Sequence, residues 1–342
     1  MKEKPRVLIA GIGGASLGTE ILKCLILAGR YRVFGCDISS FAYGHYQEGF
    51  ERTFVVERRD YVGSVLEACR EAAIDVIIPG GEEPLVLLTE ASERLAIAGL
   101  RLAGNSPLVV KRFSDKQTTF KILTELGFQI PLTVTANNPD DLENMSYPCI
   151  VKPATGTGGS SFVFLAEGRA EALLYVSYLA NNGKAPIVQE YISADEGEFT
   201  IGVLSLPDRM VVGSVALKRT FGSKLSVISK TKAGIISSGY SQGLIHDFSD
   251  LRAAAERISI AIHSEGPLNI QGRVKNGTLI PFEINPRFSA STYLRALAGF
   301  NEVDIYLQYV INGILSKPAA LRSGYYLRTL DEVFISADKI IS

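Results

Sequence analysis

The stretch NIQGRVKNGTLIPFEINPRFSAS, residues 269–291, predicts a β-hairpin with polar side chains near its end. Asn276–Gly277 is a strong turn signal, and an apolar run lies on each side of it. The second run stops at a proline and an arginine instead of continuing as an apolar strand. This hairpin is therefore the first place to look for a binding site.

Strand alternation divides the second run into a core face and a polar face. Ile280, Phe282 and Ile284 fall on the core face. Glu283 and Asn285 fall on the polar face, about 7 Å apart along the strand. Carboxylate and amide oxygens suit Mg²⁺ and suit zinc poorly. The pattern therefore predicts a magnesium site.

Gln271 on the first run offers a third oxygen, and its place depends on the register of the hairpin. A two-residue turn would set Gln271 opposite Phe282, on the core face, whereas an odd-length loop or a bulge would set it opposite Glu283. We predict the odd-length loop, which brings Gln271, Glu283 and Asn285 into one metal site. Arg287 follows a proline and adds five donors for a planar anion.

A second glycine-rich stretch, VKPATGTGGSS at residues 151–161, predicts a phosphate-binding loop. Lys152 comes directly before the glycines, and small residues let backbone N–H groups converge on phosphate oxygens beside a lysine charge. The loop is not a Walker A motif because its lysine precedes the glycines. Lys116, next to a predicted helix cap at Ser114, would add a second cation. A surface hairpin with an exposed lysine is the alternative.

The stretch IVQEYISADEGEF, residues 187–199, predicts the end of a strand that could contact a nucleotide base. The backbone at Glu190 and Ile192 would offer an N–H and a C=O to an adenine edge, and Glu198 would accept hydrogen bonds from ribose hydroxyls. A solvated acidic loop is the alternative. Downstream, residues 218–234 hold five cations and no acid, which suggests a loop that faces phosphates or a carboxylate; a solvated loop is the alternative.

Residues 6–105 alternate short apolar runs with helical patterns, which predicts βαβ units and a parallel sheet. Gly11 and Gly13 in AGIGGASLG match part of a dinucleotide fingerprint, but Ser16 stands where its last glycine should be. We expect these glycines to permit close strand–helix packing or to help seat a substrate. NAD(P) binding is the alternative.

The composition excludes a general role for charge in recruiting partners, because 35 Lys and Arg residues face 36 Asp and Glu residues. We therefore expect no nucleic-acid or membrane partner. No apolar run reaches the roughly 18–20 residues of a membrane span, and no secretory h-region is seen near Met1. Four cysteines without paired spacing fit buried, reduced thiols. Together these features predict a cytoplasmic protein.

Taken in order and spacing, four motifs resemble the ATP-grasp superfamily. They are SDK (114–116), PCIVKPATGTGGS (148–160), VQEYI (188–192) and the hairpin at 269–291. The resemblance is closest to the synthetase halves of the carbamoyl phosphate synthase large subunit and to its stand-alone relatives.

The resemblance implies an α/β chain with a Rossmann-like pre-ATP-grasp domain followed by an ATP-grasp fold with a mobile α+β lid. The first domain would span 1–112 and the second 113–320, with the lid at about 128–192. Residues 321–342 would form a strand-like tail.

The resemblance also implies roles for particular residues, with ATP and Mg²⁺ as cofactors and Mn²⁺ as a substitute. Arg287 and Lys152 would act in catalysis. ATP would contact Lys116, Lys152, Gly158, Gly159, Ser160, Glu190, Ile192 and Glu198, and the metal would contact Gln271, Glu283 and Asn285. Candidate substrate contacts are Glu82, Lys218, Arg219 and Arg295.

The expected activity is that of an ATP-dependent carboxylate–amine ligase, which activates its acid as an acyl phosphate and acts on small molecules. Three alternatives stay open: an ATP-binding sensor without transfer activity, a carbamoyl- or carboxy-phosphate-type synthetase, and an NAD(P) oxidoreductase. The substrates and a homodimeric state are left open.

Overall fold

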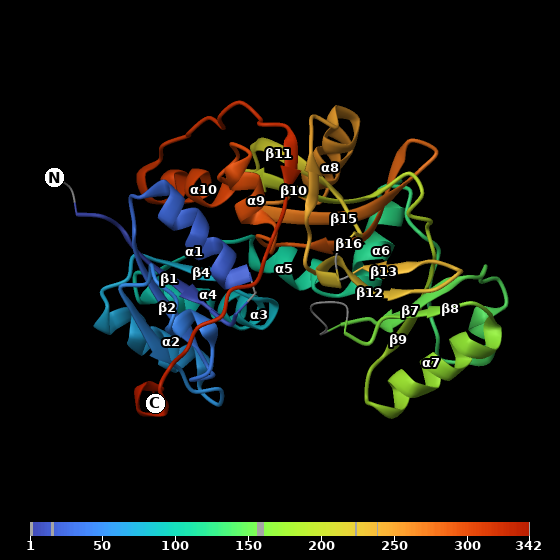
Figure 1. The fold of residues 1–342 in the computed structure, drawn as a ribbon, viewed down its shortest axis with the longest axis horizontal. Coiled ribbons are helices and arrows are strands. Elements are labelled where there is room, and N and C mark those ends of the chain that lie inside the picture. The colour runs from blue at the N-terminus through green and yellow to red at the C-terminus, as the bar shows by residue number, and fades with distance from the viewer. Residues whose placement is uncertain (1–2, 15–16, 156–160, 223, 238, 342) are drawn as a thin grey trace.

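The computed structural model of the chain describes residues 3–14, 17–155, 161–222, 224–237 and 239–341. Within them the strands form a five-stranded parallel sheet, a six-stranded sheet, a four-stranded sheet and a two-stranded hairpin. Figure 1 shows the parallel sheet at one end of the molecule, the four-stranded sheet at the other, and the six-stranded sheet between them. No described helix combines the length and apolarity needed to cross a membrane.

The N-terminal sheet confirms the predicted parallel α/β architecture. Its strand order is β3-β2-β1-β4-β5. Along β1, Val7 and Ile9 join one hydrophobic core while Leu8 and Ala10 join another, so helices cover both faces. The strands are β1 (Arg6–Ala10), β2 (Arg32–Asp37), β3 (Arg52–Val55), β4 (Val76–Pro79) and β5 (Arg101–Leu102), and the helices are α1 (Leu17–Ala28), α2 (Tyr61–Glu71), α3 (Glu82–Glu90) and α4 (Ser92–Ile97).

The central sheet, in the order β16-β15-β10-β11-β14-β17, is shared by two hydrophobic cores. Its Ile201 packs with Ile258 of α8 in one core, whereas Leu217 packs in the other with residues of α1 and α10. The central sheet and the N-terminal domain therefore share a continuous core. The elements are β10 (Glu198–Ser205), β11 (Val211–Arg219), β14 (Gly243–Ile245), β15 (Pro267–Lys275), β16 (Thr278–Asn285), β17 (Gly324–Tyr326), α8 (Ser249–Ala261), α9 (Thr292–Leu297) and α10 (Glu302–Asn312).

The hairpin β15–β16 corrects one prediction and explains another. Its turn is the two-residue Asn276–Gly277, with φ angles of +52° and +73°. The predicted odd-length loop is therefore wrong. Gln271 nevertheless lies opposite Glu283, because the ladder shifts between Gln271 and Gly272 and leaves Phe282 without a pairing partner. The bulge produces the register that the loop was expected to produce.

The four-stranded sheet, in the order β6-β9-β7-β8, carries α7 and has its own core around Val151, Leu179 and Val188. Its elements lie within the predicted lid at about 128–192. Whether this part moves as a lid stays a prediction. The elements are β6 (Thr133–Thr135), β7 (Cys149–Pro153), β8 (Phe164–Ala166), β9 (Pro186–Glu190) and α7 (Arg169–Asn181).

The remaining segments connect these sheets. Asp115, not Ser114, caps α6 by accepting from the Thr118 N–H at 2.7 Å. In the tail, the expected strand is limited to β17; the chain then crosses to the N-terminal domain, where the Ile341 N–H donates to the Tyr46 hydroxyl at 3.3 Å (Figure 1). The connecting elements are α5 (Pro107–Phe113), α6 (Lys116–Glu125), β12 (Val227–Lys230), β13 (Ile235–Ser237) and the 3₁₀ turns Tyr43–His45, Pro139–Leu142, Lys224–Ser226 and Ala337–Lys339.

All four cysteines are buried and unpaired, as predicted. Burial raises the pKa of Cys69 to about 12 and that of Cys149 to about 11. Burial also raises the pKa of Cys24 and Cys36. None of these thiols is therefore suited to act as a nucleophile at neutral pH.

Candidate functional site

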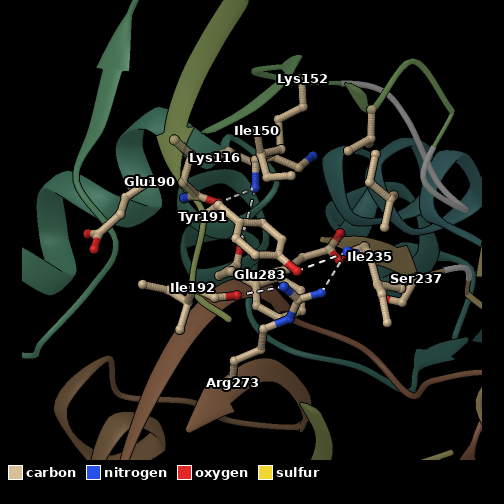
Figure 2. Close-up of a pocket in the computed structure, with 14 residues that line it drawn as sticks. Lys116, Ile150, Lys152, Glu190, Tyr191, Ile192, Ile235, Ser237, Arg273 and Glu283 are labelled. Carbon is tan, nitrogen blue, oxygen red and sulfur yellow. Dashed lines mark hydrogen bonds between the residues drawn. The ribbon is translucent and has the colours of Figure 1, made fainter. Parts of the chain in front are cut away.

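An open cavity lies where the four-stranded sheet, the central sheet and the β12–β13 hairpin meet. We call it the central cavity, and Figure 2 shows the side chains that surround it. One part of its wall is apolar and another part carries charges. The lining residues are Lys116, Ile150, Lys152, Val163, Gln189, Glu190, Tyr191, Ile192, Ile235, Ile236, Ser237, Arg273, Phe282 and Glu283.

Lys152, on β7, is a buried cation of this cavity and is only 6% exposed. Its Nζ donates to the Gln189 Oε1 at 2.8 Å and to the Phe282 carbonyl at 3.2 Å. Burial lowers the pKa of Lys152 to about 7; the positive charge of Lys116 lowers it further, whereas Glu283 opposes the shift. A buried ammonium with two neutral acceptors is poorly neutralised, so an anion in the cavity would favour its charged form.

The bulge in β16 supplies one of those acceptors. Phe282 has no partner in the ladder, and its carbonyl accepts from Lys152. Phe282 was predicted to lie on the core face, but it lines the central cavity. Leu279 and Ile284 share the core instead, five positions apart, because the extra residue reverses the alternation between them.

The three predicted metal ligands share one part of the β15–β16 ladder. Gln271 lies opposite Glu283, and Asn285 follows two positions later on the same strand. Asn285 is 7% exposed, and its Nδ2 has no hydrogen-bond partner among the described residues, while its Oδ1 accepts from the Arg287 Nη2 at 3.2 Å. Only Glu283 of these residues is part of the cavity lining.

This donor set fits Mg²⁺ better than a transition metal. It offers one carboxylate and two amide oxygens, and magnesium takes few protein oxygens and keeps water and phosphate ligands. Within the described ranges no group of three His, Cys, Asp or Glu side chains could hold a metal. A metal bound here would therefore depend on Gln271 and Asn285 as well as on Glu283.

The strand end at Glu190–Ile192 lines the central cavity. Most of the hydrogen-bonding groups that it was expected to offer to a base already have partners in the protein. The Ile192 carbonyl accepts from the Arg273 Nη1 at 2.6 Å, and the Glu190 N–H donates to the Leu132 carbonyl at 2.7 Å. The Glu190 carboxylate pairs with Lys275 and points away from the other labelled side chains (Figure 2). The Ile192 N–H has no partner within the described residues, so it is the backbone group left for a base.

Glu198 requires a correction, because it does not line the central cavity and is fully buried. Its Oε2 accepts from the Arg273 Nε at 2.8 Å, and its Oε1 accepts from the Arg219 Nη1 at 2.8 Å and from the Ser237 hydroxyl. With both oxygens occupied by cations, Glu198 has no place for ribose hydroxyls. It acts instead through the two arginines that it pairs.

Arg273 connects Glu198 to the wall of the central cavity. Its Nη2 donates to the Ile235 carbonyl at 2.7 Å, and its guanidinium lies 4.8 Å from the Tyr191 ring centre. The Tyr191 hydroxyl accepts from the Ile235 N–H at 2.9 Å. Arg273 and Tyr191 thus fix the β12–β13 hairpin against the strand end that carries Ile192 (Figure 2).

Two candidate substrate residues are also corrected. Arg219 is 4% exposed and pairs with Glu198. Arg295 is fully buried, pairs with Glu302 and donates to the hydroxyls of Ser289 and Ser291. Neither guanidinium is free to meet a substrate.

The structure places the remaining candidate substrate and ATP contacts in different surroundings. Lys218 holds its Nζ 5.9 Å from the Phe199 ring centre. Glu82 lines a second cavity beside α3. Gly158, Gly159 and Ser160 lie outside the described residues.

The first glycine cluster serves close packing. A Cβ on Gly18 or on Gly80 would come within 2.0 Å of the Gly11 carbonyl oxygen. The Asp37 carboxylate, which a dinucleotide would need for its ribose, accepts from the Ile12 N–H at 2.8 Å. These contacts support the packing role that we expected.

Sequence reasoning missed Gln189, Tyr191, Arg273 and the segment Ile235–Ser237. Gln189 and Arg273 could have been noticed, because each interrupts an apolar strand, and a buried polar group requires a partner. The hairpin segment carries no such signal. Its place depends on the Arg273 and Tyr191 contacts.

Comparisons with known proteins agree with this geometry. A family described as an ATP-grasp domain matches residues 113–291. The carbamoyl phosphate synthase large chain of Thermoanaerobacter sp. (strain X514) is 24% identical over 344 residues, covering 96% of this chain and 31% of that protein. That of Halomonas eurihalina is 23% identical over 239 residues, covering 66% and 21%. The chain thus spans about a fifth to a third of these relatives.

Solved structures show the same fold at low identity. The L-amino acid ligase from Bacillus licheniformis has a TM-score of 0.65 and 20% identity, covering 94% of this chain and 76% of that one. N5-carboxyaminoimidazole synthetase from Staphylococcus aureus, complexed with ADP, has a TM-score of 0.68 and 15% identity, covering 94% and 82%. The biotin carboxylase domain of the Hydrogenobacter thermophilus 2-oxoglutarate carboxylase, in complex with MgADP, ADP and bicarbonate, has a TM-score of 0.66 and 13% identity, covering 91% and 70%.

Proposed function

Because this chain belongs to the ATP-grasp family, we propose that it is an ATP-dependent carboxylate–amine ligase. It would join a small acid to an amine through an acyl phosphate and release ADP and phosphate. The observation that carries the proposal is the central cavity, in which Lys116 and Lys152 lie with Glu283 beside an apolar wall. Apolar side chains suit a base, and the cations suit a phosphate chain.

The cavity supports one orientation of the nucleotide. Ile150, Val163 and Ile192 would contact the adenine, whose edge would accept from the free Ile192 N–H. The phosphates would lie toward Lys116 and Lys152, with Glu283 at their far end. Glu198 takes no direct part; its pairing with Arg273 holds the adenine wall in place.

Gln271, Glu283 and Asn285 would hold Mg²⁺, which when bound neutralises phosphate charge. The buried, unpartnered Nδ2 of Asn285 is a hydrogen-bond donor, so it would bond not to the metal but to an acceptor beside it, such as a phosphate oxygen. Arg287 donates to Asn285 and to the Phe288 carbonyl, which fixes its guanidinium beside the same oxygens.

The chain's own residues would act by positioning and charge. A carboxylate oxygen of the acid attacks the γ-phosphorus, the bond between that phosphorus and the β,γ-bridging oxygen breaks, and ADP leaves. The triphosphate would favour the protonated form of Lys152, whose pKa burial lowers to about 7, and the lysine charge would offset the charge that develops on ADP. The amine nitrogen then attacks the acyl carbon, the C–O bond to phosphate breaks, and the amine proton passes to solvent. Arg287 would steady the transferred phosphoryl group.

Coupled measurement of ADP release tests the proposal. The purified protein with MgATP is given amino acids and small acids, each alone and in pairs. ADP should appear only when an acid and an amine are both present, and the new C–N bond should be detected by mass spectrometry. ADP release with bicarbonate alone would indicate a carboxy-phosphate synthetase instead of a ligase. We include this alternative because the chain is similar to carbamoyl phosphate synthase large chains. ATP binding without release on any pair would indicate a sensor.

A further inference from the structure

A second open cavity runs beside α3 and reaches α5 and the start of α6. We call it the α3 groove. Figure 1 shows α3 and α5 between the N-terminal sheet and α6. The groove also reaches Thr155, which follows β7. It therefore lies between the N-terminal domain and the part of the chain that carries Lys152.

The α3 groove is acidic, in contrast to the central cavity. Its charged lining residues are Glu82, Glu83, Glu90 and Asp115 against Lys111 alone. The Glu83 carboxylate forms an ion pair with Arg58 at 3.3 Å. Glu82 and Glu90 make no ion pair with any described residue. Two carboxylates thus remain for a cation that the protein does not supply.

Thr89 gives an independent sign of a ligand. It is 3% exposed and lines the groove, and its hydroxyl has no hydrogen-bond partner within the described residues. A threonine inside a helix commonly returns its hydroxyl to the carbonyl four residues earlier. Thr119 and Thr124 of α6 do so, each at 2.8 Å. Thr89 leaves both its donor and its acceptor unused.

The wall between the acids is apolar. Val86 and Leu87 on α3 face the groove together with Pro107 and Val110 of α5. Glu82 and Glu90 are eight residues apart on one helix, which corresponds to about 12 Å along its axis. An aliphatic chain with cationic groups matches this alternation of carboxylate and apolar surface.

The groove and the central cavity share no lining residue, but consecutive residues of the chain line them at one place. Asp115 lines the groove and the next residue, Lys116, lines the central cavity. The Lys116 N–H donates to the Ala154 carbonyl at 3.0 Å, immediately before Thr155 of the groove. A molecule held along α3 could therefore present one end to an acid activated beside Lys152.

We propose that the α3 groove binds the amine substrate, and that this substrate is an aliphatic amine with a second cationic group, such as a diamine or a basic amino acid. The assignment of the ligand as the substrate rests on the proposed ligase function. The reacting amine must lose its proton to attack, so the second group is the one whose charge the carboxylates hold throughout.

Isothermal titration without ATP tests the binding chemistry with 1,4-diaminobutane, L-lysine, n-butylamine and L-glutamate as probes. The two probes with two ammonium groups, 1,4-diaminobutane and L-lysine, should bind more tightly than n-butylamine, and L-glutamate should not bind. The double variant Glu82→Gln/Glu90→Gln should weaken diaminobutane binding by roughly tenfold, and Thr89→Val by roughly fivefold. Glu143→Gln, at an exposed position in the four-stranded sheet's module, is the matched control and should change nothing.

The outcomes separate this inference from the proposed function. Equal binding of diaminobutane to the wild type and to the double variant would overturn it, as would tighter binding of L-glutamate. If the diamine binds as expected and no acid–amine pair releases ADP, the ligase proposal fails while the groove assignment stands. If ADP release requires a neutral or acidic amine and is unchanged in the double variant, the groove assignment fails and the ligase stands.

Discussion

The central cavity and the α3 groove place their charges in opposite ways. In the central cavity, Lys152 and Arg273 are buried and bonded: Lys152 has two acceptors, and Arg273 is fixed by Glu198. In the α3 groove, Glu83 and Glu90 are exposed. The first arrangement builds a wall whose shape is set before a ligand enters. The second builds an acidic surface whose partner must come from outside.

This difference determines how strongly a substitution in each site should affect the protein. Removing a buried charge leaves its partners unpaired in a medium of low polarity, which costs much more than removing an exposed one. We therefore expect changes in the central cavity to affect stability or turnover strongly. Changes at Glu82 and Glu90 in the α3 groove should affect amine binding alone.

The largest expected effect is that of Glu198→Ala. This change leaves Arg219 and Arg273 buried without a carboxylate, and the free energy of unfolding should fall by about 3–5 kcal/mol. Denaturant titration measures it, with the exposed Glu143→Gln as the control. A loss below about 1 kcal/mol, the range of exposed pairs, would show that the central cavity does not depend on buried pairing and would remove the contrast.

Glu283→Ala should give the next largest effect. Loss of the one carboxylate in the proposed metal site should lower kcat for ADP release by about 100- to 1000-fold. Because Glu283 lies in the central cavity, diaminobutane binding in the α3 groove should stay at the wild-type level. Full turnover in this variant would refute the metal assignment.

Glu283 and Glu198 also show which parts of the site can be predicted from the sequence. The alternation in β16 correctly singled out Glu283, because side-chain period depends on local backbone geometry alone. Glu198 was assigned to the ribose because its place near a strand start suits a ligand contact. Its partners Arg219 and Arg273 lie 21 and 75 positions away and meet it only through the pairing of β10 with β11 and β15.

The fold itself was accessible to sequence reasoning wherever local patterns determine it. The parallel sheet and most helices follow from apolar periodicity. The register of the hairpin, in contrast, depends on a bulge at Phe282, and no turn residue in the sequence indicates that bulge. The α3 groove lies outside such reasoning, because it forms between elements that are distant in the chain.

The smallest expected effect concerns pH. The pKa of Lys152 is lowered to about 7, so above pH 7 the free protein must take up a proton to bind a triphosphate with this ammonium. ATP affinity should therefore fall about fivefold from pH 7 to pH 8. Titrations in buffers of different ionisation enthalpy would show the proton uptake, and Lys152→Met should abolish it. Binding in the α3 groove, which Lys152 does not line, should not change over this range.

The same shift acts on stability. Between pH 7 and the ordinary lysine value of 10.5, the unfolded chain binds more protons at Lys152 than the folded chain does. The contribution of Lys152 to the free energy of unfolding should therefore rise with pH across that window. The Lys152→Met variant should lack this contribution.

The most direct test of the account is the affinity of the wild-type protein and of Lys152→Met for MgATP, measured by isothermal titration at pH 7. The account predicts one site in the wild type and a loss of at least tenfold in affinity in the variant, because a buried charge-assisted contact to phosphate is removed. Equal affinity in the two proteins, or no binding in either, would contradict the assignment of the central cavity to ATP.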